Sequence, residues 1–160
     1  MGQLLLFLDF DGVTHPVVGT PLFRAECMAA LQLALKEVDV EIVVTSTWRE
    51  TQSLAELKET LKPLGKTVQG VTPVIDEPFM HHVRYHEVLL YLTQSNQVDA
   101  SWIAIDDTPG FYPDGASVYY TDPTKGFTSE DIPLFADMLD RALANQAIHK
   151  NDVIGDDDLK

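Results

Sequence analysis

The sequence contains little cysteine, few basic residues and no long apolar run. Because Cys27 is the single cysteine, no intrachain disulfide can form, and a cytoplasmic location is expected. We expect the Cys27 thiol to pack in the core. No apolar run approaches the roughly 20 residues that a membrane-spanning helix needs. The first residues lack the basic segment and the cleavage site of a signal peptide. We therefore expect neither secretion nor membrane association.

Basic residues are scarce: 11 Lys and Arg stand against 25 Asp and Glu, which gives a formal net charge of −14. This charge disfavours binding of extended nucleic acid, because a run of phosphates requires a basic surface. It leaves room for a single phosphate group held through a metal ion, since the ion changes the local field. The length of 160 residues and the hydrophobic content of 45% indicate one globular unit with a sizeable core.

Expected strands and helices alternate along the chain. Apolar and β-branched runs predict strands at 4–8, 40–45, 66–71, 102–105 and 117–120. Helical periodicity predicts helices at 24–37, 51–61 and 80–95, and a last helix that contains 132–143. The alternation predicts a three-layer α/β/α, Rossmann-like fold with a central parallel sheet. We expect one domain over 1–147 and a flexible acidic tail over 148–160.

The first expected strand, 4–8, runs directly into Asp9, Phe10, Asp11 and Gly12. A buried strand should not end in two carboxylates unless something holds them, because unpaired buried charge is costly. The strand period of two places Asp9 and Asp11 on one side, where a cation between them would relieve their repulsion. Ligands that are all oxygen suit Mg²⁺. The alternative is a strand end with solvated aspartates.

Polar residues also follow two other expected strands. Thr45, Ser46 and Thr47 follow the second strand, and Asp106 and Asp107 follow the fourth. In a parallel sheet these groups lie at the same edge as the end of the first strand, where ligands bind. Carboxylates and hydroxyls together predict a site for a hard cation and a phosphate group.

Three segments resemble motifs of the haloacid dehalogenase superfamily, whose members are mostly phosphohydrolases. Residues 9–14 resemble the first motif, the strand that ends in 45–47 resembles the second, and 103–107 resemble the fourth in its paired-aspartate form. Further details are similar to a small capless subgroup that includes phosphatase-like domains associated with RNA repair proteins: His15-Pro16, Trp48-Arg49 and Gly126-Phe127-Thr128.

The resemblance implies a Mg²⁺-dependent phosphohydrolase, specifically a phosphomonoesterase. Asp9 would be the nucleophile that forms an aspartyl-phosphate, and Asp11 would be the general acid and then the general base. Asp9, the Asp11 carbonyl and Asp107 would ligate Mg²⁺, with Asp106 binding directly or through water. The alternative is a catalytically weak or inactive module that binds a phosphorylated partner.

The resemblance also implies a set of groups that bind the phosphate. Ser46 would hydrogen-bond the phosphoryl oxygens, with Thr45 or Thr47 as substitutes, and Gly12 would allow a sharp turn beside them. The third motif usually supplies a lysine before the fourth strand, and no lysine stands there. Arg84 is the expected replacement, although arginine does not substitute for lysine by default.

Other residues remain open on sequence grounds. Lys66 and Lys125 are weaker candidates for the missing cation, and Arg84 itself could be an ordinary solvated helix arginine. Arg49 suits a substrate contact or a salt bridge equally well, and His15 lies close enough in sequence to the first motif to contact substrate. The histidines within 81–86 fit a solvated helix surface better than a zinc site.

Neither segment in which superfamily members insert a cap domain is long enough here to fold into one. Residues 13–24 allow a short flap, and 71–80 form a loop bracketed by prolines. An uncapped crevice would accept phosphorylated macromolecules as well as small phosphate esters. The sequence identifies neither the substrate nor the oligomeric state.

Overall fold

The computed structural model describes residues 4–19 and 22–158, with side chains described up to residue 146. Within these residues, five strands and four α-helices follow one another. The strands are β1 (Leu4–Leu8), β2 (Val40–Val44), β3 (Val68–Val71), β4 (Ser101–Asp106) and β5 (Val118–Tyr120). The α-helices are α1 (Ala25–Leu35), α2 (Leu54–Leu61), α3 (Val83–Gln94) and α4 (Asp131–Asp158). Short 3₁₀ helices are η1 (Thr47–Glu50), η2 (Lys62–Leu64) and η3 (Pro109–Phe111).

The five strands form one parallel sheet in the order β3-β2-β1-β4-β5, with β1 at its centre. Leu8 lies opposite Val44 on one side and Ile105 on the other. β1 and β2 therefore end at the same level, one residue before the end of β4. The ladder continues one residue further through the amide of Asp9, which donates to the carbonyl of Ile105 at 3.1 Å. The predicted parallel sheet is confirmed, and its strand order brings the three polar strand ends together.

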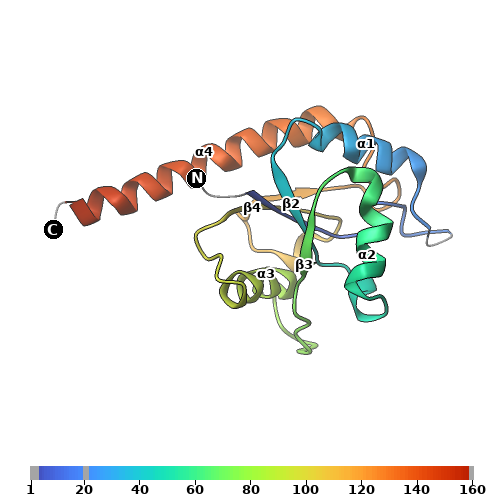
Figure 1. The fold of residues 1–160 in the computed structure, drawn as a ribbon, viewed down its shortest axis with the longest axis horizontal. Helices are drawn as coiled ribbons and strands as arrows, with labels where there is room; N and C mark the ends of the chain where they lie inside the picture. Colours follow the sequence, from blue (N-terminus) through green and yellow to red (C-terminus); the bar gives the residue numbers. More distant parts are fainter. Residues whose placement is uncertain (1–3, 20–21, 159–160) are drawn as a thin grey trace.

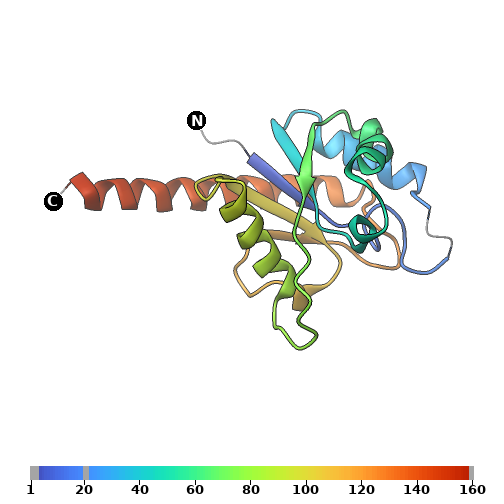
Figure 2. The ribbon, with the colours of Figure 1, turned by 60° about the horizontal axis from the view of Figure 1, so that its bottom comes forward.

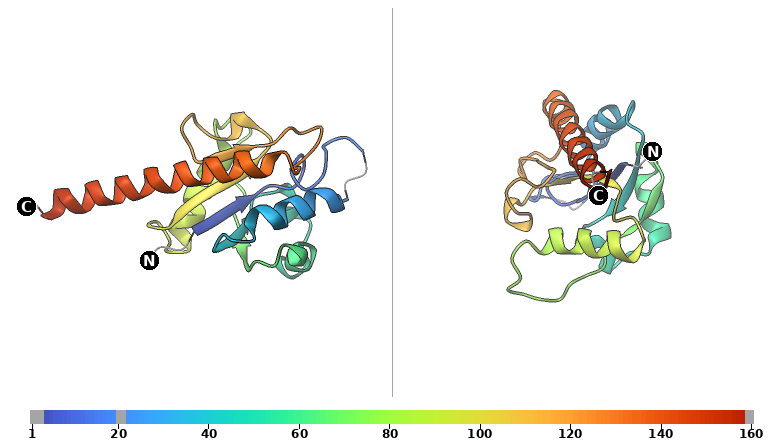
Figure 3. Two further views of the ribbon diagram at one scale, coloured as in Figure 1. Left: turned by 90° about the horizontal axis from the view of Figure 1, so that it is seen from above. Right: turned by 90° about the vertical axis from the view of Figure 1, so that its left-hand side faces the viewer.

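Side chains of β1 alternate between two cores, which explains the uninterrupted apolar run. Leu4, Leu6 and Leu8 pack into a core shared with α1, α2 and α4. Leu5 and Phe7 pack into a second core beneath α3. Figure 3 shows α1 and α4 on one face of the sheet and α3 on the other. A parallel sheet buried on both faces is the expected three-layer α/β/α architecture.

Local signals account for the places where helices begin. α2 begins at Leu54, later than the sequence predicts, because Ser53 and Glu56 form a capping box there and η1 occupies the preceding residues. α3 begins at Val83, after His82 adopts a left-handed conformation with φ of 56°. The residues from 72 to 82 are therefore loop, and no cap domain interrupts the described chain between β3 and α3.

The last helix, α4, extends well past the sheet, as Figures 1 and 2 show. It continues through Asp158, whereas the apolar pattern indicates a helix only as far as residue 143. The side chains of 147–158 and residues 159–160 lie outside the described part, and the division into a domain and a flexible tail stays a prediction. None of the helices within 4–19 and 22–158 combines the length and apolar character that crossing a bilayer requires.

Candidate active site

Three carboxylates meet where β1 and β4 end. Asp9, Asp106 and Asp107 each offer an oxygen atom within 4.8 Å of the others. Asp9 is 8% exposed and Asp106 is fully buried. We call these three residues the acidic cluster. The histidines of 81–86 are not part of this group.

The acidic cluster is electrostatically unfavourable without a cation. Burial, followed by the charge of Asp106, raises the pKa of Asp9 well above its ordinary value. Burial raises the pKa of Asp106 to about 7. The Oδ2 atom of Asp106 is buried and has no hydrogen-bond partner among the described residues. A hard cation with oxygen ligands would satisfy that atom and stabilise the ionised forms, so the residues present fit Mg²⁺.

Asp11 lies apart from the acidic cluster, which corrects the expectation that Asp9 and Asp11 flank one cation with their carboxylates. The alternation of the strand stops at Leu8, and a turn follows in which the amide of Val13 donates to the carbonyl of Phe10 at 2.9 Å. The side chain of Asp11 is 47% exposed and contacts His15. Its expected contribution to the metal through the main-chain carbonyl stays a prediction.

Gly12 lies against the acidic cluster and cannot be replaced without strain. Its φ of +79° favours glycine, and a Cβ atom built there would lie 2.2 Å from Oδ2 of Asp107. Thr121, just after β5, donates its hydroxyl to the carbonyl of Gly12 at 2.7 Å. The turn after β1 is therefore fixed by its neighbours at the carboxyl edge of the sheet.

The three hydroxyl residues after β2 have different surroundings. Thr45 is fully buried, and its Oγ1 has no hydrogen-bond partner among the described residues. Ser46 is also buried, but its hydroxyl accepts from the amide of Trp48 at 3.2 Å and caps η1. Thr47 is exposed. Both Thr45 and Ser46 keep a hydroxyl hydrogen that can be donated to a ligand, because accepting a hydrogen bond from Trp48 does not use the hydroxyl hydrogen of Ser46.

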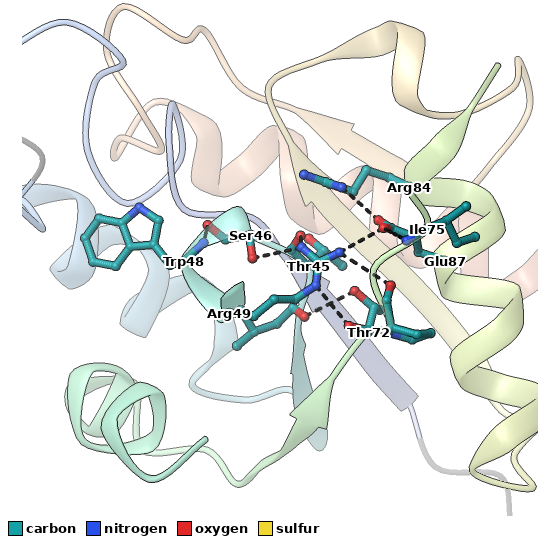
Figure 4. A network of polar contacts seen from close by, with 10 residues as sticks. Thr45, Ser46, Trp48, Arg49, Thr72, Ile75, Arg84 and Glu87 are labelled. Atoms are coloured by element: carbon teal, nitrogen blue, oxygen red, sulfur yellow. Dashed lines mark hydrogen bonds and ion pairs between the residues drawn. The ribbon is translucent and has the colours of Figure 1, made fainter. Parts of the chain in front are cut away.

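Glu87 of α3 holds two arginines at the same edge (Figure 4). Its carboxylate accepts from Nη2 of Arg49 at 2.9 Å, Nη1 of Arg84 at 2.8 Å and the amide of Ile75 at 2.9 Å. The side chains of Arg49 and Glu87 are each 1% exposed. We call Arg49, Arg84 and Glu87 the arginine network. It shows that Arg49 forms a buried salt bridge, one of the two alternatives that the sequence left open.

Arg49 also ties β2 to the segment after β3. Its guanidinium donates to the carbonyls of Thr45 and Ser46 and, on the other side, to the carbonyls of Thr72 and Pro73. Figure 4 shows these contacts converging on one side chain. Orphan carbonyls at the carboxyl ends of two strands are thereby satisfied.

Arg84 faces the acidic cluster and is not a solvated helix arginine. Its side chain is 11% exposed, and its guanidinium carbon lies 5.0 Å from the centroid of the Phe111 ring. Burial is the main influence on the pKa values of Asp9 and Asp106, and the positive charge of Arg84 acts in the opposite direction on both. Arg84 therefore places positive charge near the acidic cluster, and its role as the missing cation stays a prediction.

Three further polar residues lie at the site, and sequence reasoning missed two of them, Thr108 and Glu87. Thr108 donates its amide to Asp106 and its hydroxyl to Asp107, each at 2.9 Å. Tyr112 is 2% exposed, and its hydroxyl has no partner among the described residues. Burial, reinforced by the charges of Asp106 and Asp9, raises the pKa of Tyr112 well above its ordinary value. Glu87 is the third. Only its spacing of three residues from Arg84 could have indicated it.

An open groove of about 490 Å³ adjoins the acidic cluster on the side of Arg84. The lining includes Arg84, Thr108, Phe111 and residues of the loop before α3. Thr108 links the groove to the acidic cluster, because it lines the groove and donates to Asp106 and Asp107.

A capless Rossmann-like sheet with an acidic cluster at its carboxyl edge defines a domain of the haloacid dehalogenase (HAD) type. The chain belongs to the family described as the HAD domain in Swiss Army Knife RNA repair proteins, whose family model matches residues 5–132. That range begins at the second residue of β1, contains the other four strands and ends at the second residue of α4. No curated protein matches the chain. Membership in this family indicates chemistry of the hydrolase or phosphatase type.

Proposed function

We propose that this protein is a Mg²⁺-dependent phosphomonoesterase in which Asp9 forms an aspartyl-phosphate. The observation that carries the proposal is the acidic cluster, in which Asp9 is buried beside Asp106 and Asp107 and faces the charge of Arg84. The same burial that disfavours three carboxylates alone suits a divalent cation and a phosphate group together.

Asp9, Asp106 and Asp107 would hold the metal, joined by the main-chain carbonyl of Asp11. The unpartnered Oδ2 of Asp106 supports this assignment. When bound, Mg²⁺ would supply the positive charge that keeps these carboxylates ionised and offsets the charge of the phosphoryl oxygens.

In the first half of the reaction, a carboxylate oxygen of Asp9 bonds to phosphorus while the ester P–O bond breaks. Asp11 gives its proton to the departing oxygen. In the second half, Asp11 takes a proton from water as the water oxygen attacks phosphorus. The Asp9–phosphorus bond then breaks, and phosphate leaves. Asp11 suits both roles because it lies outside the acidic cluster and is half exposed.

Two groups are best placed to hold the phosphoryl oxygens. Thr45 offers a buried hydroxyl without a partner, and Arg84 offers charge beside Asp9. Donors that are fixed before substrate arrives act most strongly on developing charge. Ser46 stays in the proposed phosphate-binding set as a further donor, because its hydroxyl accepts from Trp48 and keeps its own hydrogen. Thr47 and Gly12 stay in the set as a secondary contact and a shape-determining residue.

The substrate is proposed to be a phosphate monoester at the end of a macromolecule. No cap covers the crevice in the described chain, and the matching family is named for RNA repair proteins. A phosphorylated RNA end is therefore the first substrate to test. The net charge of −14 argues against contacts with a long stretch of RNA, so the terminal phosphate itself would provide most of the recognition.

The test measures phosphate release with Mg²⁺ and after chelation, from an aryl phosphate and from short RNAs phosphorylated at the 5′ or the 3′ end. Asp9→Asn should abolish release from every substrate. Asp140→Asn makes the same change at an exposed position on α4 and should leave the rate unchanged. Tight binding of phosphorylated ligands without any turnover would instead support the binding module.

A further inference from the structure

Two ring nitrogens converge on one oxygen of Asp11. Nε2 of His15 lies 2.8 Å from Oδ1 of Asp11, and Nε1 of Trp48 donates to the same oxygen at 3.3 Å. The two rings come from different segments, the turn after β1 and the 3₁₀ helix η1 after β2. Within the described residues, no hydrogen bond engages Oδ2 of Asp11. One carboxyl oxygen is therefore held, and the other is open.

The His15 ring is itself held in place. It is 2% exposed, its Nδ1 lies 3.2 Å from Oγ1 of Thr14, and Thr14 in turn donates to the carbonyl of Phe10 at 3.1 Å. The main chain closes the same turn, because the amide of Gly12 donates to the carbonyl of His15 at 2.8 Å. A hydrogen bond to a ring fixed in this way restricts a half-exposed aspartate that would otherwise sample several rotamers.

Aromatic packing fixes both rings relative to each other. The centroids of His15 and Trp48 are 5.6 Å apart, and Phe23 lies 5.9 Å from His15 and 5.2 Å from Trp48. Phe10 packs edge-on against Trp48 at 5.4 Å. We call Phe10, His15, Phe23 and Trp48 the aromatic wall. It joins the strand end that carries Asp9 to the strand end that carries Thr45.

We propose that His15 and Trp48 are positioning residues, which hold Oδ1 of Asp11 against the aromatic wall so that Oδ2 faces the leaving group. The inference rests on the proposed function, in which Asp11 is the general acid. His15 and Trp48 neither gain nor lose a proton: the proton moves from Oδ2 of Asp11 to the departing oxygen as the ester bond breaks. Catalysis by a positioned acid depends on such preorganisation.

The test uses two substrates that differ in their need for an acid. An aryl phosphate releases a weakly basic phenolate that leaves without a proton, whereas an alkyl phosphate releases a strongly basic alkoxide that requires one. The measured quantity is kcat/KM, because it reports the steps up to formation of the phosphoryl-enzyme and excludes its hydrolysis. A general loss of structure would lower kcat/KM for both substrates alike.

For His15→Leu we expect kcat/KM for the alkyl phosphate to fall about 10- to 100-fold, with a change of about twofold or less for the aryl phosphate. Trp48→Phe keeps the ring and removes the N–H donor, and it should show a smaller loss with the same selectivity. His15→Gln offers an amide donor near the position of Nε2 and should recover most of the activity on the alkyl phosphate. On an Asp11→Asn background, His15→Leu should cause no further loss, since the two residues act as a unit.

Equal losses for both substrates, or an undiminished effect of His15→Leu on the Asp11→Asn background, would overturn the positioning role while leaving the phosphatase intact. If the wild-type protein hydrolyses neither substrate, the proposed function fails, and this inference fails with it. Thermal unfolding of each variant separates loss of fold from loss of positioning. Trp48→Phe decides the question if His15→Leu does not fold.

Discussion

The acidic cluster and the arginine network lie at the same edge of the sheet, but they differ in whether the protein compensates the charge of their buried carboxylates. In the arginine network, Glu87 accepts from two guanidinium groups and an amide, so its charge is compensated by the protein. In the acidic cluster, burial raises the pKa values of Asp9 and Asp106, and an oxygen of Asp106 is unpartnered. The first arrangement holds the backbone, and the second is completed only by a ligand.

The largest effect should come from Asp9→Asn. We expect phosphate release to fall at least about 10³-fold, because the nucleophile is lost. The apo protein should at the same time become slightly more stable, since one of three buried like charges is removed. Steady-state assays and thermal unfolding in chelator measure both quantities. A variant that loses stability as well as activity would show that Asp9 has a structural role of the kind we assign to Glu87.

The next effect should come from Glu87→Gln, which leaves two buried arginines without their counter-charge. We expect the free energy of unfolding to fall by about 2–4 kcal/mol, measured by chemical denaturation. Asp137→Asn is the matched control, because Asp137 pairs with Arg141 at the surface, where the two side chains are 70% and 71% exposed. That pair should contribute less than about 1 kcal/mol. Equal losses in the two variants would remove the contrast.

Gly12→Ala tests how closely the turn after β1 packs on the acidic cluster. The added Cβ would meet Asp107 and a positive φ, so we expect a loss of about 1–3 kcal/mol and weaker binding of Mg²⁺. Gly110→Ala is the control, since a Cβ at Gly110 has no neighbour within 4 Å and no positive φ is required there. Titration calorimetry with Mg²⁺ and denaturation measure the two effects. Unchanged Mg²⁺ affinity in Gly12→Ala would contradict the placement of Asp107 in the metal site.

The smallest effect should be the dependence of stability on pH. Burial raises the pKa of Asp106 to about 7 in the folded state, whereas the ordinary value of an aspartate is near 4. The folded state therefore binds this proton more tightly than the unfolded chain does, and the resulting stabilisation is fully present below about pH 4. That contribution is lost as pH rises through about 7, and Asp9 acts in the same direction. The melting temperature of the apo protein should therefore fall by a few degrees, on the order of 2–6 °C, between pH 5 and pH 8.

Added Mg²⁺ should raise the melting temperature more at pH 8 than at pH 5, because protons compete with the cation for the same carboxylates. Asp106→Asn should flatten the pH dependence and reduce the response to Mg²⁺. An apo protein whose stability rises across this interval would contradict the assignment of the acidic cluster.

The sequence predicted the fold well because the strands have a simple signature. β1, β2 and β4 are short, mostly apolar runs followed by polar residues, and the uninterrupted run of β1 reflects burial on both faces. The first residues of the helices were harder to predict, because α2 begins where Ser53 caps it and α3 begins after the left-handed conformation of His82. Such local geometry does not follow from hydrophobic periodicity.

The candidate site was predictable only where its residues follow strands. Asp9 and the Asp106–Asp107 pair were found because strand ends in a parallel sheet converge. Asp11 was misplaced because the strand period does not continue into a turn. Glu87 and Tyr112 reach the site from α3 and from the loop after η3, and their positions depend on long-range packing that no local pattern encodes.

The central claim is that Asp9, supported by the acidic cluster, becomes covalently phosphorylated. The most direct measurement mixes the Asp11→Asn variant with an aryl phosphate and Mg²⁺, quenches the mixture in acid, and locates the phosphoryl group by mass spectrometry of peptides. The account predicts a phosphorylated peptide that contains Asp9 and is absent without Mg²⁺, because Asp11→Asn slows hydrolysis of the intermediate. Release of the aryl leaving group with no phosphoryl group on Asp9 would contradict the account.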